Sequence, residues 1–222
     1  MVEGYGFAII PDVLESEKIA TLLESFVDLN LPRSRAGVRH LLGIDCVAHI
    51  ANDLRCLEFA RGILGGDAYP FRATLFDKSP EANWLITWHQ DTALPLKDKR
   101  EAPGWGPWSV KDGITYAHAP AEALEHVLAI RLHLDDSTEE NGPLRVVPGS
   151  HLHGVLSDQQ VEASVANSKT VTCLVPRGGV ILMRPLIIHA SSKSRSHVPR
   201  RVLHIEYASH NAVSAPLELA IA

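Results

Sequence analysis

A series of short β-type runs occupies most of the chain after residue 69, and it constrains the fold more than any other feature. These runs are rich in β-branched and other apolar residues and lie at 69–77, 84–89, 127–134, 170–175, 180–183, 186–190 and 201–208. Turn-forming sequences separate them, such as Asn141-Gly142-Pro143 and Arg177-Gly178-Gly179. Because helices do not alternate with these runs, the pattern favours an antiparallel sandwich or barrel.

Two helical segments are predicted before these strands, after a short strand at 4–10. Asp12 and Glu15 form a potential N-cap and capping box for the first helix, whose apolar residues recur at helical spacing as far as Leu29. The second helix is expected at about 47–64, where Gly65-Gly66 ends it. Further along, Ser157 and Gln160 could cap one short helix.

The simplest arrangement packs the first helices against one outer face of the sheet. We therefore expect one domain, 1–222, that is mainly β with flanking α-helices, in which helices at about 12–65 cover a β-core at about 69–210. The segment 95–120 fits neither pattern. A loop of this length is usually a functional lid or a disordered insert, and its Trp105 and Trp108 could either shield a site or anchor the loop.

Charge and composition exclude several classes of function. The net charge of −5 gives no general attraction to nucleic acid or to an anionic membrane. The N-terminus has no signal-peptide pattern, and no apolar stretch approaches the length of a membrane span. The three cysteines have no metal-binding spacing and are interpreted as reduced thiols of a cytoplasmic protein.

The sequence Trp-His-Gln-Asp at 88–91 is the strongest functional signal. Alternate residues of a strand point to the same side, so His89 and Asp91 can reach one ion. A second apolar run ends in a histidine a hundred residues later, at His189. Two imidazoles and one carboxylate are the set that holds a non-haem Fe(II) by one face and leaves other coordination positions open.

A second His-x-Asp pair, His133 and Asp135, competes with this assignment. It follows the alternation of Ile130, Leu132 and Leu134, which places Arg131, His133 and Asp135 together on a polar face. The simpler interpretation of this pair is a sheet face with satisfied polar groups. His89 and Asp91 differ because they lie at a strand end, beside the long 95–120 segment, where reactive centres are common.

Two adjacent arginines follow His189. Oxygenases with this ligand set commonly use a keto-dicarboxylate, whose far carboxylate needs the planar fork of an arginine. Arg200 shares its side of the strand with Val202, His204 and Glu206, which suit a barrel interior, whereas Arg201 shares parity with the apolar residues that would face the helices. The alternation favours Arg200, although both could be solvated charges beside Pro199.

These residues together resemble the phytanoyl-CoA dioxygenase family of Fe(II)/2-oxoglutarate oxygenases. The resemblance rests on Trp-His-Gln-Asp at 88–91, Asn-Gly-Pro-Leu-Arg-Val-Val-Pro-Gly-Ser-His at 141–151, His-x-Ser at 189–191 with Arg200 eleven residues after His189, and the opening Gly-Tyr-Gly-Phe-Ala-Ile-Ile-Pro-Asp-Val-Leu. It implies a double-stranded β-helix (jelly roll, cupin-like), with iron at His89, Asp91 and His189. It also implies that Arg200 and Ser191 hold 2-oxoglutarate, with Lys78 and Trp108 as further cosubstrate residues.

The resemblance implies that the chain hydroxylates a small-molecule metabolite with O2 and releases succinate and CO2. A complete ligand triad favours this outcome over halogenation, and the short chain argues against a bulky acyl-CoA substrate. Two alternatives stay open: a cupin-like metal enzyme that does not use 2-oxoglutarate, and a catalytically silent ligand-binding barrel. The loop at 192–195, Ser-Lys-Ser-Arg, could contact an anion or be a solvated loop. The sequence specifies neither the substrate nor the oligomeric state.

Overall fold

A computed structural model describes all residues of the chain except 30, 32–36 and 80–81. The helices are short, and most of them precede the strands: α1 Val2–Tyr5, α2 Ser16–Asp28, η1 Leu41–Gly43, α3 Asp45–Ala51, α4 Leu54–Leu64, α5 Ala121–Leu124, η2 Ser150–His153, α6 Asp158–Ala166 and η3 His210–Ala212. The strands are β1 Phe7–Ile10, β2 Tyr69–Lys78, β3 Ile86–His89, β4 Ala93–Leu96, β5 Trp108–Lys111, β6 Ile114–His118, β7 Val127–His133, β8 Leu144–Val146, β9 Val171–Cys173, β10 Val180–Met183, β11 His189–Ser191 and β12 Arg200–Ala208.

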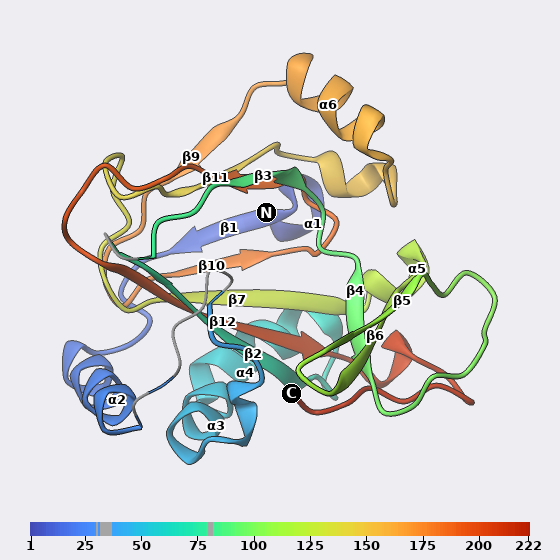
Figure 1. The fold of residues 1–222 in the computed structure, drawn as a ribbon, viewed down its shortest axis with the longest axis horizontal. Helices are drawn as coiled ribbons and strands as arrows, with labels where there is room; N and C mark the ends of the chain where they lie inside the picture. Colours follow the sequence, from blue (N-terminus) through green and yellow to red (C-terminus); the bar gives the residue numbers. More distant parts are fainter. Residues whose placement is uncertain (30, 32–36, 80–81) are drawn as a thin grey trace.

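Two antiparallel sheets face each other and form the core (Figure 1). The larger sheet has the order β1-β10-β7-β12-β2, and the smaller has the order β3-β11-β8-β9. From β7 onward the chain passes repeatedly between the sheets, since β8, β9 and β11 belong to the smaller one and β10 and β12 to the larger one. This topology is the predicted double-stranded β-helix, or jelly roll.

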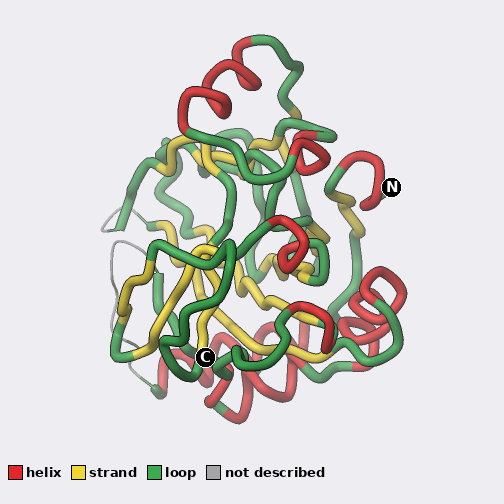
Figure 2. The backbone as a smooth tube through the Cα atoms, turned by 90° about the vertical axis from the view of Figure 1, so that its right-hand side faces the viewer, coloured by secondary structure: helices red, strands yellow, loops and turns green. Residues whose placement is uncertain are grey.

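Helices α2, α3 and α4 cover the outer face of the larger sheet. In Figure 2 they gather beneath the strands, and α6 stands apart above them. Residues such as Ile19 on α2 and Leu57 on α4 share one buried apolar cluster with Leu203 and Ile205 of β12. Tyr207 belongs to the same cluster, and its hydroxyl donates to the carbonyl oxygen of Ala51 at 2.8 Å. The helices therefore bury the face of β12 that carries the odd-numbered residues, and the even-numbered residues face the space between the sheets.

The helix boundaries correct two predictions. Asp12 is not the N-cap of α2; it has a left-handed φ of 53°, and α2 begins at Ser16. The amides of Val13 and Leu14 both donate to the carbonyl of Gly178 at 2.9 Å, which ties this segment to the β9–β10 turn and delays the helix. The predicted second helix is two helices, because the side chain of Asp53 caps α4 by accepting from the amide of Arg55. The capping box of Ser157 and Gln160 on α6 is confirmed.

The segment 95–120 is not the irregular loop or disordered insert that was expected. It forms a third antiparallel sheet of order β4-β6-β5, in which β5 and β6 are a hairpin closed at Asp112 and Gly113. Trp105 and Trp108 pack against an apolar cluster that includes Leu94 and Leu124. This sheet lies at the right-hand end of the barrel in Figure 1, next to the end of β3.

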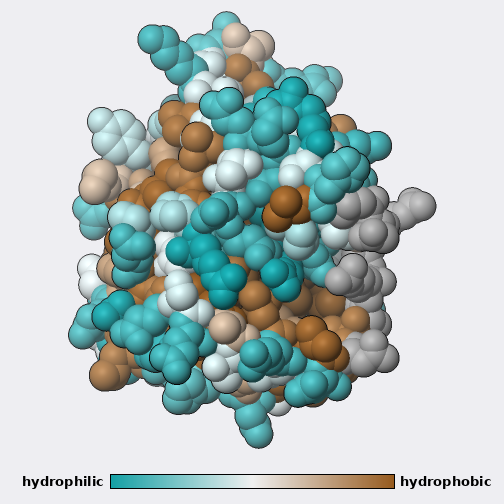
Figure 3. All heavy atoms as spheres, turned by 90° about the vertical axis from the view of Figure 1, so that its left-hand side faces the viewer, coloured by the Kyte–Doolittle hydropathy of each residue, from teal (hydrophilic) through white to brown (hydrophobic). Residues whose placement is uncertain are grey.

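The opposite end of the barrel is formed by the connections between the two sheets. The segments 134–143 and 192–199 run from β7 to β8 and from β11 to β12. Figure 3 views this end and shows polar side chains gathered across its middle, with more apolar residues toward the lower part. The strand ends that carry Lys78, Ser191 and Arg200 lie on this side of the molecule.

Candidate active site

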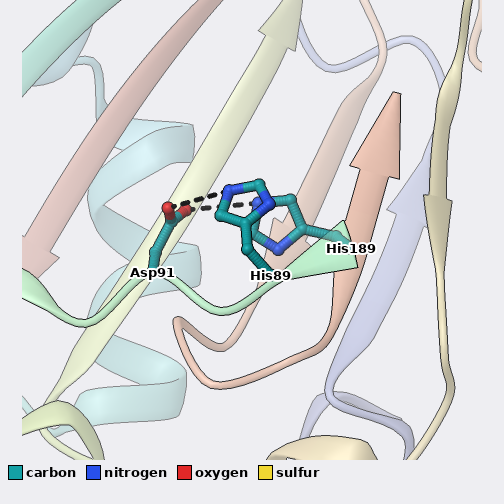
Figure 4. Close-up of side chains that lie close together, drawn as sticks. All are labelled: His89, Asp91 and His189. Atoms are coloured by element: carbon teal, nitrogen blue, oxygen red, sulfur yellow. Dashed lines mark ion pairs between the residues drawn. The ribbon is translucent and has the colours of Figure 1, made fainter. Parts of the chain in front are cut away.

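His89, Asp91 and His189 meet between the two sheets, as Figure 4 shows. One ligand atom from each residue lies within 4.8 Å of the others, and no other such group of metal-binding side chains occurs in the described part of the chain. The convergence follows from strand pairing, because His89 at the end of β3 lies directly opposite His189 at the start of β11. Asp91 follows β3 by two residues, and its amide donates to the carbonyl of Pro185 at 3.0 Å.

Both imidazoles present the same nitrogen to Asp91. The Nδ1 atom of His89 lies 2.8 Å from the carbonyl oxygen of Thr87, and that of His189 lies 2.9 Å from the carbonyl of Ile187. A carbonyl oxygen only accepts, so Nδ1 carries the proton and the lone pair lies on Nε2. The Nε2 atoms are 3.6 Å and 3.4 Å from the carboxylate oxygens of Asp91.

This arrangement fits a divalent transition metal. Two Nε2 lone pairs and one carboxylate converge from one side, and backbone carbonyls fix the tautomers as they do for metal-bound histidines. Burial opposes ionisation of Asp91, but the neighbouring His189 and His89 hold its pKa well below the usual value. Burial lowers the pKa of His189 to about 4, even though Asp91 acts in the other direction. Asp91 is therefore ionised and His189 neutral near neutral pH. For His89, burial is outweighed by the carboxylate of Asp91, which raises the pKa, so a metal would bind there in competition with a proton.

Gln90 fixes the turn between the two ligands of the motif. Its side-chain amide donates to the carbonyls of Gly154 and Leu186 at 2.9 and 2.7 Å and accepts from the amide of Leu156 at 2.8 Å. These bonds attach the end of β3 to two other segments. Gln90 therefore holds His89 and Asp91 in place from the side opposite the centre.

The triad lines a cavity of about 320 Å³ between the sheets. Lys78, Ser191 and Arg200 line the same cavity. Arg200 is paired with Lys78 in the β12–β2 ladder, and the Nζ atom of Lys78 donates to the hydroxyl of Ser191 at 2.6 Å and to the carbonyl of Ser192. Three of the four predicted cosubstrate residues thus form one group.

Arg200 has hydrogen-bonding capacity that the described residues do not use. Its Nε donates to the carbonyl of Asn141 at 3.1 Å, whereas its buried Nη1 has no partner within the described part of the chain. Burial and the nearby Arg131 lower the pKa of Arg200 to about 9. Burial, Arg200 and Arg131 lower the pKa of Lys78 to about 7. A buried, cationic and incompletely bonded group is suited to a carboxylate.

Arg201 is occupied elsewhere. Its Nε and Nη2 atoms donate to both carboxylate oxygens of Asp135 at 2.8 and 2.7 Å. The predicted choice of Arg200 therefore agrees with the geometry. His133 belongs to no group of metal-binding side chains among the described residues, and the carboxylate of Asp135 is occupied by Arg201. Burial and the nearby Arg131 lower the pKa of His133 to about 3, and its Nδ1 lies 3.1 Å from the Arg131 carbonyl, as suits a neutral histidine on a sheet face.

Trp108 is the one predicted cosubstrate residue that does not line this cavity. It lies on β5 and packs against the apolar cluster at that end of the barrel, with the Nζ atom of Lys99 6.0 Å from its ring centroid. The geometry gives its predicted role no support.

Sequence reasoning missed several charged residues of the cavity. Arg72 of β2 forms a buried ion pair with Glu206 of β12, and Arg131 lies 3.1 Å from the Nδ1 atom of His204. Arg39 and Lys111 line the cavity from outside the two main sheets. The alternation of β12 predicted that His204 and Glu206 point inward, and the same parity applied to β2 from Lys78 would have found Arg72.

A jelly roll that holds two histidines and one carboxylate in this geometry is characteristic of non-haem iron oxygenases. A model of the family described as Phytanoyl-CoA dioxygenase (PhyH) matches residues 2–202, and the chain belongs to this family. This finding confirms the resemblance that the sequence motifs indicated.

Individual relatives are distant. The chain is 28% identical to an L-proline trans-4-hydroxylase of Streptomyces griseoviridis over 67% of its own length, and it spans 57% of that protein. It is 23% identical to an ectoine dioxygenase of Stutzerimonas stutzeri, with 96% of this chain and 77% of the relative covered. Coverage of the first relative is thus little more than half of its length.

Solved structures show the same fold. AviO1 from Streptomyces viridochromogenes superposes with a TM-score of 0.68 at 24% identity and covers 97% of this chain and 95% of its own. The epimerase SnoN, solved in complex with Fe3+, alpha ketoglutarate and nogalamycin RO, has a TM-score of 0.72 at 19% identity, with coverage of 99% and 83%. Among the described residues, no helix combines the length and apolar character needed to cross a membrane.

Proposed function

We propose that the chain is a non-haem Fe(II)/2-oxoglutarate-dependent oxygenase that hydroxylates a small-molecule metabolite with O2. The observation that carries the proposal is a cavity that contains both the triad of His89, Asp91 and His189 and a guanidinium nitrogen of Arg200 that has no partner among the described residues. Membership of the family supports the same activity, as do relatives named as a proline hydroxylase and an ectoine dioxygenase.

In this proposal the residues divide into two groups. His89, Asp91 and His189 would hold Fe(II), and Arg200, Ser191 and Lys78 would hold the far carboxylate of 2-oxoglutarate. When bound, the metal and the keto-acid supply the oxidation: one atom of O2 enters a substrate C–H bond as hydroxyl, and the other enters succinate as CO2 leaves. The chain contributes orientation, through Gln90 and the histidine carbonyl contacts, and a buried cation that selects a dicarboxylate.

We further propose that residues 1–222 act as one domain. The apolar cluster shared by the helices at 16–64 and the larger sheet supports this view. Cytoplasmic location is also a proposal, supported by the free state of Cys46, Cys56 and Cys173. The expected partners are a small-molecule substrate and O2, without nucleic acid or membrane.

The decisive experiment is anaerobic addition of Fe(II) and 2-oxoglutarate to the protein, followed by visible absorption spectroscopy. A metal-to-ligand charge-transfer band is expected in the wild type and not in His89→Ala. His133→Ala is the matched control, since His133 is a buried histidine outside the triad, and thermal melting confirms that each variant is folded. A band that survives His89→Ala but disappears in a folded His133→Ala would overturn the assignment.

The two alternative functions give different results in the same protein. A cupin-like metal enzyme without a keto-acid would bind metal at the triad but form no succinate, and Arg200→Ala would leave its activity nearly unchanged. A silent ligand-binding barrel would bind neither the metal nor the keto-acid. Succinate formation that depends on both His89 and Arg200 excludes both alternatives.

A further inference from the structure

The cavity contains more positive charge than the proposed metal and cosubstrate require. Its lining has two carboxylates, Asp91 and Glu206, against six cationic side chains: Arg39, Arg72, Lys78, Lys111, Arg131 and Arg200. With neutral histidines the excess is four positive charges when Lys78 is protonated and three when it is neutral, since its pKa is about 7. Fe(II) and the 2-oxoglutarate dianion cancel each other in this balance, so the excess would persist in the loaded enzyme. Such a cavity attracts and retains anions.

The cationic residues lie in two separate places. The ladder between β2 and β12 pairs Lys78 with Arg200 at one end and Arg72 with Glu206 further along. Six residues separate Arg200 from Glu206, which is roughly 20 Å of extended strand. A five-carbon diacid spans only about 6 Å at ordinary carbon–carbon bond lengths. 2-Oxoglutarate held at Arg200 therefore does not reach the cationic residues at the Arg72 end of the ladder.

The second group is built around Arg72 and Tyr116. Glu206 neutralises Arg72, which also donates to the carbonyl of Ala93 at 3.1 Å and lies 5.6 Å from the centroid of the Tyr116 ring. The hydroxyl of Tyr116 is 2.8 Å from the Nε2 atom of His40. Tyr116 is 1% exposed, so these contacts form a fixed platform at the hairpin end of the cavity.

Two further cations, Lys111 and Arg39, stand at this platform, and neither is paired with a buried carboxylate among the described residues. The Nζ atom of Lys111 lies 4.8 Å from the centroid of Tyr116 and has no hydrogen bond or ion pair with any residue in the described part of the chain. Arg39 forms an ion pair with Asp112 at 3.8 Å, and the side chain of Asp112 is 66% exposed, so solvent weakens this pair. Partial burial, together with Arg72 and Arg39, lowers the pKa of Lys111, as expected for a cation that lacks a partner.

We propose that the primary substrate is a small anion whose carboxylate or phosphate group is held by Lys111 and Arg39 at the β5–β6 hairpin. This inference rests on the proposed function. Arg72 is a positioning residue, since Glu206 occupies its guanidinium and Tyr116 stacks beside it. The anion would be bound at one end of the cavity, and the rest of the substrate would extend toward the triad.

The test uses the enzyme loaded with Fe(II) and 2-oxoglutarate and measures substrate-stimulated succinate formation. The probes are amino acids with their carboxamides, and phosphate monoesters with their parent alcohols. Probes that carry the carboxylate or phosphate group are expected to stimulate turnover, and the counterparts that lack this group are not. Lys111→Met should raise the KM for a stimulating acid about tenfold, as expected for loss of one charged hydrogen bond at a half-buried site, with a smaller change in kcat.

Several controls separate this inference from the proposed function. Lys111→Arg should restore the KM, and Lys169→Met, a change at an exposed lysine outside the cavity, should have no effect. The KM for 2-oxoglutarate and the charge-transfer band should be unchanged in Lys111→Met. If no charge-transfer band forms in the wild type, the proposed function is wrong. If the band forms, the remaining measurements test only the substrate inference.

Carboxamides or alcohols that stimulate as well as the corresponding carboxylates or phosphates would overturn the inference, as would a Lys111→Met enzyme with an unchanged KM. If no probe stimulates turnover, calorimetric titration of the anaerobic loaded enzyme with the same acids decides the matter. Binding that weakens in Lys111→Met supports the inference, and absence of binding at millimolar concentration rejects it. The relative response to carboxylates and phosphates identifies which oxyanion is preferred.

Discussion

Replacing Arg200 by glutamine tests the proposed cosubstrate site most directly. Arg200 is 3% exposed, and its Nη1 has no partner within the described part of the chain. A bidentate carboxylate would make two charged hydrogen bonds worth about 1.5–3 kcal/mol each. Lys78, which lies beside Ser191, would still attract the carboxylate in the variant. We therefore expect a loss at the lower end, about 3 kcal/mol, or about 150-fold weaker binding of 2-oxoglutarate.

Arg201→Gln is the matched control, because it removes the same charge one residue away. Arg201 is bonded to Asp135 outside the cavity, so binding of 2-oxoglutarate should change less than about twofold. Loss of this partly exposed ion pair should instead lower the free energy of unfolding by about 1 kcal/mol. Arg200→Gln removes an uncompensated buried cation, so without 2-oxoglutarate its unfolding free energy should be unchanged or higher.

The assay is anaerobic titration of the Fe(II) protein with 2-oxoglutarate, followed by the visible band, together with urea denaturation of each variant. The two substitutions should therefore affect different quantities. Arg200→Gln should lower the affinity for 2-oxoglutarate, and Arg201→Gln should lower the stability of the fold. Equal affinity for 2-oxoglutarate in the wild type and Arg200→Gln would refute the reasoning. A greater loss of affinity in Arg201→Gln would show that the wrong arginine was chosen.

Three further predictions concern stability and reactivity. Gln90→Leu leaves two carbonyls and one amide without their partner, so it should lower the free energy of unfolding by about 2–4 kcal/mol, as measured by urea denaturation. It should also weaken Fe(II) binding in a metal titration. If both the stability and the Fe(II) affinity are unchanged, the positioning role of Gln90 is excluded. Burial opposes ionisation of Glu206, but Arg72 outweighs it and lowers the pKa. The resulting stabilisation is complete above the ordinary carboxyl pKa of about 4.5 and is lost as the pH falls through the lower folded-state value. Urea midpoints of Glu206→Gln should therefore depend less on acidic pH than those of the wild type, and parallel pH profiles would contradict this. Burial raises the pKa of Cys56 to about 11 and that of Cys173 to about 12, so few of these thiols are ionised at mildly alkaline pH. Mass spectrometry after iodoacetamide treatment should therefore find Cys46, which is only partly buried, alkylated first. Earlier labelling of Cys173 would contradict this prediction.

The residues that meet at the centre could be predicted because their spacing follows the geometry of strands. A separation of two residues lets His89 at the end of β3 and Asp91 just beyond it point to the same side, and an apolar run that ends in a histidine supplies His189, the third residue of the group. The same alternation on β12 separated Arg200, which lines the cavity, from Arg201, which does not. Patterns of this kind depend only on local backbone geometry, so the spacing of residues in the sequence is enough to recognise them.

The errors arose where contacts distant in sequence decide the local structure. The carbonyl of Gly178 binds the amides after Asp12 and moves the start of α2 to Ser16. In the segment 95–120, glycine and proline obscure β5 and β6, which pair with each other, and β6 also pairs with β4. The interruption between α3 and α4 is different, since the cap of Asp53 is local and could have been recognised.

The charge of the cavity is the clearest example of a property that depends on contacts between residues distant in sequence. Parity alone places Glu206 inside the barrel and allows Arg72 to do the same, but only the register of β2 against β12 shows that they face each other. Once Glu206 is matched to Arg72, it cannot balance Lys111 or Arg39, which arrive from other parts of the chain. A negative net charge for the whole chain is therefore compatible with a strongly cationic cavity, because specificity for an anion depends on which few charges the fold brings together and leaves unpaired.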